Sequence, residues 1–151
     1  MLFHPLTGLC VVQKSIMEPL ELGPCTESPA WIYTPENTLA LKNSLFCLKA
    51  EGAGQPAKIG IFCSDSKSKW QLISDSKMHI AANISGNANS VCLDVGDDGQ
   101  RIVTNPCKCL SNDQDCDPKS QWFKLVDSTR SFASRRPFSL VPYWLGNWKV
   151  L

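Results

Sequence analysis

Eight cysteines are the residues of this 151-residue chain whose spacing most clearly indicates chemistry. Six of them form successive pairs whose members lie 15 or 16 residues apart: Cys10 and Cys25, Cys47 and Cys63, Cys92 and Cys107. An even cysteine count is typical of a disulfide framework made in an oxidising compartment, although eight cysteines alone allow about 105 connectivities. The near-equal loops favour pairing within each repeat of the pattern, which leaves Cys109 and Cys116 as a fourth pair.

Cys109 and Cys116 enclose a short polar insert, which we expect a disulfide to close as a small loop. The alternative is a zinc site that uses Cys107, Cys109 and Cys116. The sequence offers no fourth ligand, and Cys107 and Cys109 are closer together than the cysteines of zinc motifs usually are. We therefore predict four disulfides, no metal and no cofactor.

Catalytic chemistry finds little support in the remaining residues. His4 and His79 are the only histidines, and disulfide pairing leaves no free thiol to act as a nucleophile beside either of them. We expect His79 to be an exposed or hydrogen-bonded residue of a strand. A glycosidase needs two carboxylates held across a cleft, whereas Asp97 and Asp98 lie in a turn-like stretch as surface acids. The chain is predicted to be non-catalytic.

Three repeats must position these cysteines. Each cysteine pair is followed by a tryptophan, namely Trp31, Trp70 and Trp122, and short apolar runs alternate with turn residues between these marks. This pattern predicts short strands, and no segment keeps a helical period long enough to compete. A repeat of about 40 residues cannot bury its apolar face alone. The sequence therefore predicts an all-β fold whose repeats pack around a shared core, with the three tryptophans as equivalent anchors.

Charge is distributed unevenly along the chain. Residues 128–151 carry four basic residues and no acid, so residues 1–127 have a net charge of −3 within the overall +1. We place this basic, aromatic tail outside the main domain. Near-neutral charge does not favour nucleic acid or an anionic membrane. The cysteines and a sequon at Asn83 indicate the secretory pathway or extracellular space, and a poor signal peptide suggests part of a longer protein.

The threefold repeat, the stretch Cys92-Leu93-Asp94-Val95 and the tryptophan after each cysteine pair resemble the ricin B-type β-trefoil lectins, also called family 13 carbohydrate-binding modules. Residues 4–10 and 107–126 further resemble the C-terminal trefoil of plant glycoside hydrolase family 5 cellulase-like proteins. The resemblance implies a β-trefoil of about twelve strands over residues 5–127, with pseudo-threefold symmetry. Its repeats would span about residues 5–42, 43–85 and 86–127.

The resemblance also implies where sugar would bind. In the family each pocket uses an Asp two residues after the first cysteine, an aromatic ring two residues before the second, and an Asn/Gln pair before the tryptophan. At the Asp, ring and Gln positions the repeats have, in order, Val12, Gly23 and Pro29; Lys49, Ile61 and Ser68; Asp94, Asn105 and Ser120. Only the third repeat keeps a carboxylate. Lys119 adjoins its Gln position, and Gln121 is one residue out of register.

We therefore predict a weak lectin-like module with one site at Asp94, Asn105, Lys119 and Ser120. Phe123 could supply the missing ring, whereas Asp94 could instead support the turn at residues 96–99. The expected partners are a plant cell-wall polysaccharide or galactose-type glycan and a glycoside hydrolase catalytic domain, from which any glycosidase activity would come. The alternative is a degenerate trefoil that acts as a structural or protein-interaction scaffold. Kunitz-type inhibitors, another trefoil class, lack this cysteine pattern.

Overall fold

Short β-strands make up most of the structure, a computed structural model that describes residues 1–84, 90–111 and 116–126. The strands are β1 (Leu2–His4), β2 (Leu9–Val12), β3 (Glu21–Gly23), β4 (Trp31–Tyr33), β5 (Leu39–Leu41), β6 (Cys47–Lys49), β7 (Gln55–Pro56), β8 (Lys58–Gly60), β9 (Gln71–Ile73), β10 (His79–Ala82), β11 (Val91–Val95), β12 (Ile102–Pro106) and β13 (Lys124–Leu125). Single 3-10 turns follow β3, β8 and β12: η1 (Cys25–Glu27), η2 (Ser66–Ser68) and η3 (Lys119–Gln121), respectively. These ranges contain no α-helix, and the predicted all-β class is confirmed.

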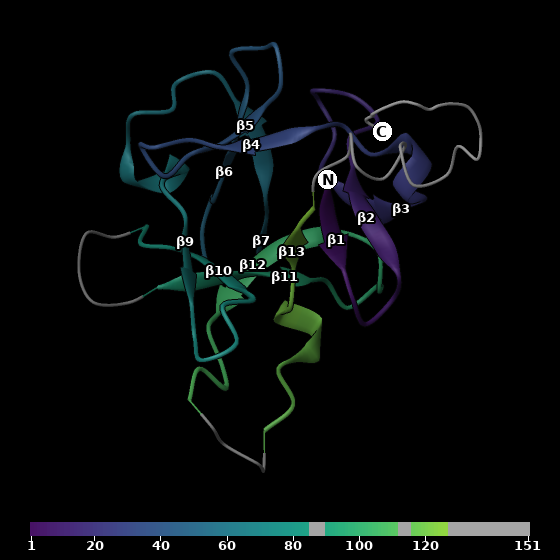
Figure 1. The fold of residues 1–151 in the computed structure, drawn as a ribbon, viewed down its shortest axis with the longest axis vertical. Coiled ribbons are helices and arrows are strands. Elements are labelled where there is room, and N and C mark those ends of the chain that lie inside the picture. The colour runs from purple at the N-terminus through teal and green to yellow at the C-terminus, as the bar shows by residue number, and fades with distance from the viewer. Residues whose placement is uncertain (85–89, 112–115, 127–151) are drawn as a thin grey trace, which may run out of the picture.

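Three antiparallel sheets repeat one arrangement (Figure 1), which agrees with the three repeats expected from the cysteine pattern and with the trefoil that the resemblance implies. Their strand orders are β13-β1-β2-β3, β4-β5-β6-β8 and β9-β10-β11-β12, with β7 added at the edge of the last. In each sheet the last strand of one unit pairs with the first strand of the next. Only Ala57 separates β7 from β8, so these two count as one interrupted strand and every unit supplies a first to a fourth strand.

Strand register shows which residues are equivalent. In each sheet one residue of the first strand faces both a cysteine and a residue of the preceding last strand: Phe3 (Cys10, Lys124), Ala40 (Cys47, Ile32) and Ala81 (Cys92, Gln71). Trp31, Trp70 and Phe123 each directly precede the last-strand residue and are therefore equivalent. All three are buried, whereas Trp122 is only partly buried. The prediction of Trp122 as the third anchor was wrong by one residue, because the register turns Phe123 inward instead.

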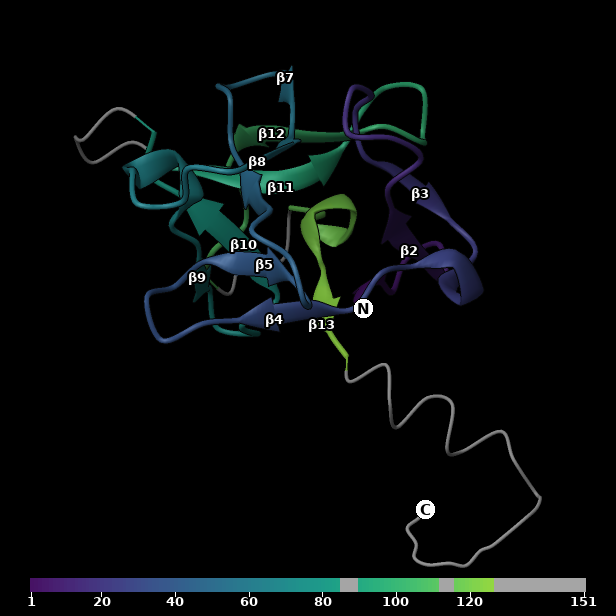
Figure 2. The same ribbon diagram turned by 90° about the horizontal axis from the view of Figure 1, so that it is seen from above.

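The core lies where the three sheets meet. Its fully buried members include equivalent residues of the second strands and first strands, namely Val11, Leu48 and Leu93, and Leu2, Leu39 and Ile80. Each such side chain contributes about 1.5–3 kcal/mol by leaving water. The Trp70 indole Nε1 donates to the Leu48 carbonyl at 2.9 Å, which ties one anchor to the second strand beneath it. In Figure 2, η3 and β13 lie in the middle, between the β9–β12 sheet and the β2–β3 hairpin.

Four disulfides join the pairs that the repeat pattern predicts: Cys10–Cys25, Cys47–Cys63, Cys92–Cys107 and Cys109–Cys116. The first three tie each second strand to the segment that follows the third strand. The fourth has no counterpart in the other repeats. Since Cys107, Cys109 and Cys116 are all disulfide-bonded, they do not form the alternative zinc site.

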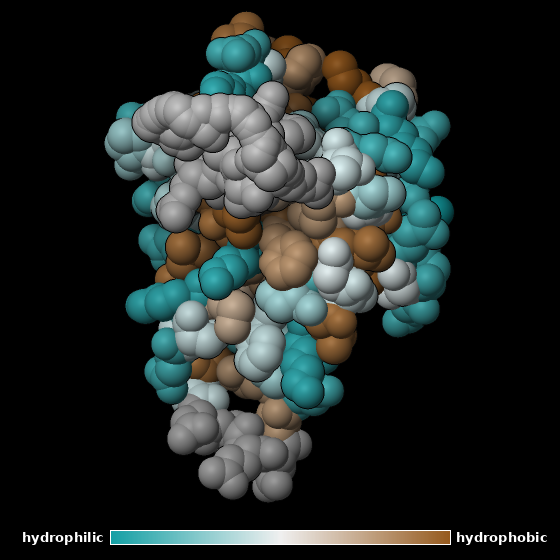
Figure 3. Space-filling view, turned by 45° about the vertical axis from the view of Figure 1, so that its right-hand side comes forward, coloured by the Kyte–Doolittle hydropathy of each residue, from teal (hydrophilic) through white to brown (hydrophobic). Residues whose placement is uncertain are grey.

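Apolar side chains on the face shown in Figure 3 reach the surface in separate places between polar ones. None of the helical turns in the described residues is long and apolar enough to cross a bilayer. Asn83 is exposed, but Ser85 of its sequon lies outside the described residues. The predicted tail at 128–151 and residues 112–115 of the insert lie outside them as well.

Candidate functional site

Asp94 on β11 stands at the centre of the predicted third-repeat site, and its side chain is buried (5% exposed). Its Oδ2 accepts hydrogen bonds from Asn105 Nδ2 at 2.9 Å and Gln121 Nε2 at 3.2 Å. Its Oδ1 accepts one from the Val95 backbone N–H at 2.7 Å. Strand pairing places Asn105 opposite Cys92, so Asn105 and Asp94 lie on the same face of the β11–β12 hairpin. The carboxylate is thus held by two amides, of which Gln121 is fully buried and Asn105 is partly exposed.

Gln121 occupies the position that the sequence analysis assigned to Ser120, the Gln position of the third repeat. Its backbone N–H donates to the Pro118 carbonyl, as that of Ser68 donates to Asp65, so Gln121 and not Ser120 occupies the Gln position. Gln121 is fully buried, donates to the Pro106 carbonyl and accepts from the Lys108 N–H at 3.1 Å. The error arose from counting back from Trp122. A pattern of Gln, any residue and an aromatic ending at Phe123 would have found it.

Lys119 and Ser120 lie on η3, beside Gln121. Lys119 is exposed, and its backbone N–H donates to Asp117 Oδ1 at 3.1 Å. The Ser120 carbonyl lies 3.0 Å from His4 Nε2. The structure therefore brings Asp94 and Asn105 into contact. The hydrogen bonds described for Lys119 and Ser120 go instead to Asp117 and His4.

An open hollow of about 380 Å³ adjoins Asn105, and it is lined by Gly54, Pro56, Gly96, Asp97, Asp98, Arg101, Val103 and Asn105. Asp94 lies behind this wall. Asp98 Oδ1 accepts the backbone N–H groups of Gln100 at 3.0 Å and Arg101 at 2.9 Å, and these bonds hold the pKa of Asp98 below its usual range. Asp98, and not Asp94, therefore supports this turn, which corrects the alternative role suggested for Asp94.

The equivalent positions in the first two repeats are closed by their own side chains. Gly23 and Gly60 face the first cysteine of their repeats as Asn105 faces Cys92, so they occupy the ring position. Ile61, predicted there, is one residue beyond it, because the second cysteine pair encloses one extra residue. A Cβ atom at Gly23 would lie 2.9 Å from Val12 Cγ2, and one at Gly60 would overlap the Lys49 stem. Each glycine thus allows the residue at the Asp position to lie across it.

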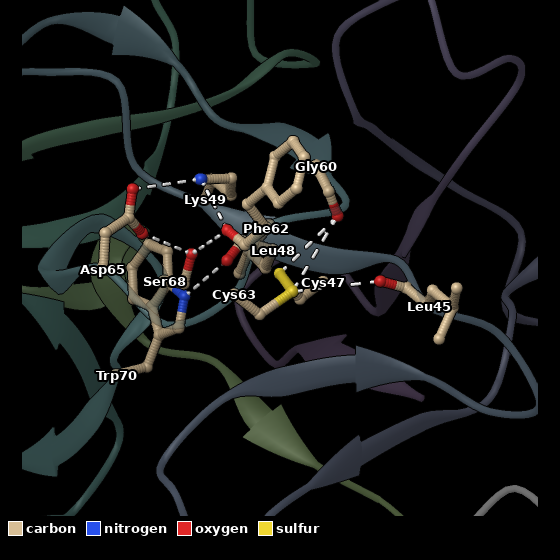
Figure 4. Close-up of polar contacts among 10 residues, drawn as sticks. All are labelled: Leu45, Cys47, Leu48, Lys49, Gly60, Phe62, Cys63, Asp65, Ser68 and Trp70. Carbon is tan, nitrogen blue, oxygen red and sulfur yellow. Dashed lines mark hydrogen bonds and ion pairs between the residues drawn. A yellow bond between two sulfur atoms is a disulfide. The ribbon is translucent and has the colours of Figure 1, made fainter.

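The second repeat also pairs its charges internally (Figure 4). Lys49 Nζ donates to the Phe62 carbonyl at 2.7 Å and to Asp65 Oδ2 at 3.2 Å. The Ser68 hydroxyl donates to Asp65 Oδ1 at 2.8 Å, and this bond, together with the Lys49 ammonium, holds the pKa of Asp65 below its usual range. A lysine that is bonded in this way leaves no acceptor for a sugar hydroxyl at that position.

Two buried histidines lie near Asp94. His4 Nδ1 is 2.9 Å from Thr7 Oγ1, and its ring centroid is 4.8 Å from that of Phe123. His79 Nδ1 is 2.9 Å from the Ser74 hydroxyl. Burial lowers the pKa of both histidines, although the Asp94 charge acts in the opposite direction. His79 is therefore a buried strand residue and not an exposed one, and Phe123 is too deeply buried to serve as a stacking ring.

Comparison with known families gives one match. The family model of the ricin-type beta-trefoil lectin domain matches residues 1–116, which is most of the chain. No curated protein matches the sequence.

Proposed function

We propose that this chain, which belongs to the ricin-type beta-trefoil lectin domain family, is a non-catalytic carbohydrate-binding module with one weak repeat-type site, in the third repeat. Domains of this family bind carbohydrate and are in general non-catalytic. Such domains, and disulfides like those found here, are typical of extracellular proteins. Asp94 and Asn105 form the centre of the proposed site, with Lys119 and Ser120 at its margin.

The single observation that carries this proposal is the difference between the three equivalent positions. Val12 and Lys49 lie across their glycines, whereas the third repeat keeps a carboxylate and places a partly exposed amide, Asn105, on the wall of an open hollow. An amide donates and accepts hydrogen bonds and a carboxylate accepts them, so the two together suit paired sugar hydroxyls. The acids Asp97 and Asp98 on the same wall add further acceptors.

Affinity at this site should be low. The ring position holds Asn105, so the apolar face of a sugar has no aromatic surface to stack on there. Asp94 already accepts from three protein donors, which a ligand would have to share or displace. We expect a dissociation constant in the millimolar range, equivalent to about 4 kcal/mol.

Polysaccharide pull-down and glycan-array binding of three variants test the proposal. Asn105→Ala removes the amide on the hollow wall, and Asp94→Asn removes the charge behind it while keeping the side-chain shape. Lys49→Ala changes the equivalent residue of the second repeat and is the matched control. Loss of binding in the first two variants alone, with the unfolding transition retained, would support the site, whereas binding unaffected by Asn105→Ala and Asp94→Asn would remove it.

The alternative function is a trefoil scaffold without sugar binding, and the internal hydrogen bonds of Asp94 are the observation that favours it. Absence of signal on every glycan tested would support this alternative. We further propose that the module is related to the accessory trefoil of plant cell-wall family 5 glycoside hydrolases, on the likeness of residues 4–10 and 107–126. The transcript sequence upstream of the Met1 codon tests that relation, because a barrel-type catalytic domain encoded there would support it and an unrelated domain would not.

A further inference from the structure

A second hollow, of about 440 Å³, lies apart from the three repeat-equivalent positions. It is lined by Ser74, Asp75, Ser76, Cys109, Leu110, Ser111, Pro118 and Trp122, and it shares no residue with the hollow beside Asn105. Its volume is within the range of about 300–1,000 Å³ that is usual for small-molecule sites.

Two segments from different repeats build this hollow. The turn between β9 and β10 and the stretch after β12 lie at the same end of the molecule (Figure 1). The Asp75 backbone N–H donates to the Leu110 carbonyl at 3.3 Å and joins them. The Cys109–Cys116 disulfide, which the other repeats lack, fixes the second segment. The hollow therefore depends on a disulfide-bonded segment that only the third repeat has, and it does not follow from the threefold pattern.

Backbone strain is concentrated at the same place. Among the described residues other than glycine and asparagine, only Ser74 (φ 75°), Lys77 (φ 60°) and Cys109 (φ 59°) have a left-handed backbone. Ser74 and Cys109 line the hollow, and Lys77 belongs to the same turn as Ser74. Such conformations are strained and tend to occur at binding sites, where the surrounding structure maintains them.

The lining offers one aromatic ring among hydrogen-bonding groups. Trp122 is partly buried, and its indole N–H, like that of Trp31, finds no acceptor among the described residues. Asp75 and Ser76 are exposed beside it. The Ser74 hydroxyl lies 2.9 Å from Nδ1 of the buried His79 and 3.2 Å from the Ser76 hydroxyl, so the histidine orients the first hydroxyl and Ser74 contacts the second.

These features favour a neutral, hydroxyl-rich ligand. No lysine or arginine of the described residues lines the hollow, so these residues offer no cation to neutralise an anion. A tryptophan ring covers the apolar C–H face of a pyranose, and a carboxylate and hydroxyls bond its polar edge. The ring position of the third repeat lacks such an aromatic residue, and Trp122 supplies one at a different location.

We propose that the hollow around Trp122 is a second saccharide-binding subsite, in which a neutral pyranose stacks on the indole ring and bonds to Asp75 and Ser76. The ligand class rests on the proposed function, but the residues do not, because they are separate from Asp94 and Asn105.

Titration of the ¹⁵N-labelled chain with lactose, cellotetraose and xylotetraose, each to about 50 mM, tests this subsite in the millimolar range expected of a weak lectin. The indole N–H resonance of Trp122 is assigned by its absence in Trp122→Phe. We expect at least one sugar to shift that resonance in the wild type and in Asn105→Ala. Asp75→Asn should raise the dissociation constant read from that shift about tenfold or more, which corresponds to 1.4 kcal/mol or more at room temperature. Because Asp75 is exposed, this variant should fold normally.

The outcomes separate the two sites. A Trp122 shift that persists in Asn105→Ala but weakens in Asp75→Asn supports the subsite even if the third-repeat site fails. A shift that is lost in Asn105→Ala and unchanged in Asp75→Asn overturns the subsite and supports the third-repeat site. If no sugar moves the Trp122 resonance while the glycan array is positive, the subsite is wrong, and if both measurements are negative, both proposals are wrong.

Discussion

The second and third repeats place opposite charges at one position of the same scaffold. In the second repeat Lys49 extends over Gly60 to the half-exposed Asp65, and in the third Asp94 lies buried between Asn105 and Gln121. The strand register is identical in both. The difference therefore lies in what the third strand contributes, since a glycine lets the opposing side chain cover the hairpin and an asparagine holds it back.

This comparison shows two ways of satisfying one site without a ligand. The second repeat uses an ion pair that water can partly reach, and such pairs contribute little to stability. The third repeat uses a buried carboxylate that depends on amide donors, and loss of a donor to a buried charge is costly. Substitutions at matched positions should therefore have unequal effects.

The largest effect is expected from Gln121→Ala. The variant leaves Asp94 with one fewer donor and leaves the Pro106 carbonyl and Lys108 N–H without their partner, which should lower the free energy of unfolding by about 3 kcal/mol. The matched change Ser68→Ala should lower it by only about 1 kcal/mol, because Asp65 is half exposed. Urea unfolding of the two variants measures both values. Equal losses would mean that the two repeats are stabilised in the same way.

The next largest change in the free energy of unfolding is expected from the glycines at the ring position, Gly23 and Gly60. In Gly23→Ala the new methyl group meets the buried Val12, so we expect a loss of about 1–3 kcal/mol. In Gly60→Ala it overlaps the middle of the Lys49 stem, which can move by giving up the ammonium's bonds to Phe62 and Asp65, so we expect a smaller loss of about 1 kcal/mol. Thermal unfolding of the pair tests this order. A larger loss in Gly60→Ala would indicate that Lys49 is held rigidly.

Lys49→Met should have a smaller effect still. It keeps the apolar stem over Gly60 and removes the ammonium, so the free energy of unfolding should change by less than about 1 kcal/mol. High salt should leave the variant unaffected and weaken the wild type slightly. A loss of several kcal/mol in urea unfolding would show that the Lys49–Asp65 pair behaves as a buried charge pair, like the site of the third repeat.

The smallest and most gradual effect is expected on acidification. Burial lowers the pKa of His4 and His79 below 6.5, so the unfolded chain binds protons that the folded chain does not. The free energy of unfolding should be level above about pH 6.5 and fall as the pH drops below it, down to the lowered pKa values. Amide exchange should show β10–β12 losing protection before β6–β8. The control His4→Gln, His79→Gln should remove the slope, and a slope that remains would place its origin elsewhere.

Much of the fold could be predicted from the sequence because cysteine spacing directly reports the repeat. That spacing gives three of the pairings and leaves the fourth pair, whereas the all-β class follows from the short apolar runs between turn residues. The register errors arose where local spacing is ambiguous. The two adjacent aromatics Trp122 and Phe123 both fit an anchor, and the extra residue between Cys47 and Cys63 can fall on either side of β8. Strand pairing resolves both cases.

The state of the site was less predictable than its position. The residue types at Lys49 and Asp94 showed which repeat keeps a carboxylate, but not that Lys49 covers Gly60 or that Gln121 bonds to Asp94. Those contacts depend on side-chain direction across strands. The hollow around Trp122 was missed because its walls come from turns that are far apart in the sequence, and the strained backbone of Ser74 and Cys109 leaves no mark in residue type.

The pairing of β1 with β13, reinforced by the bond from the Met1 ammonium to the Val126 carbonyl at 2.6 Å, makes the first and last described strands neighbours. The β4–β5 and β9–β10 pairs are equivalent to the β1–β13 pair, but in each of them a turn of the chain connects the two strands. The architecture therefore does not depend on which of the three places holds the chain ends. Consider a circular permutant that begins at Leu39, ends at Tyr33 and links Val126 to Met1 by a short peptide. It would keep every strand pair, and only the covalent turn between β4 and β5 would be open. Met1 and Val126 therefore lie at the same edge of the trefoil.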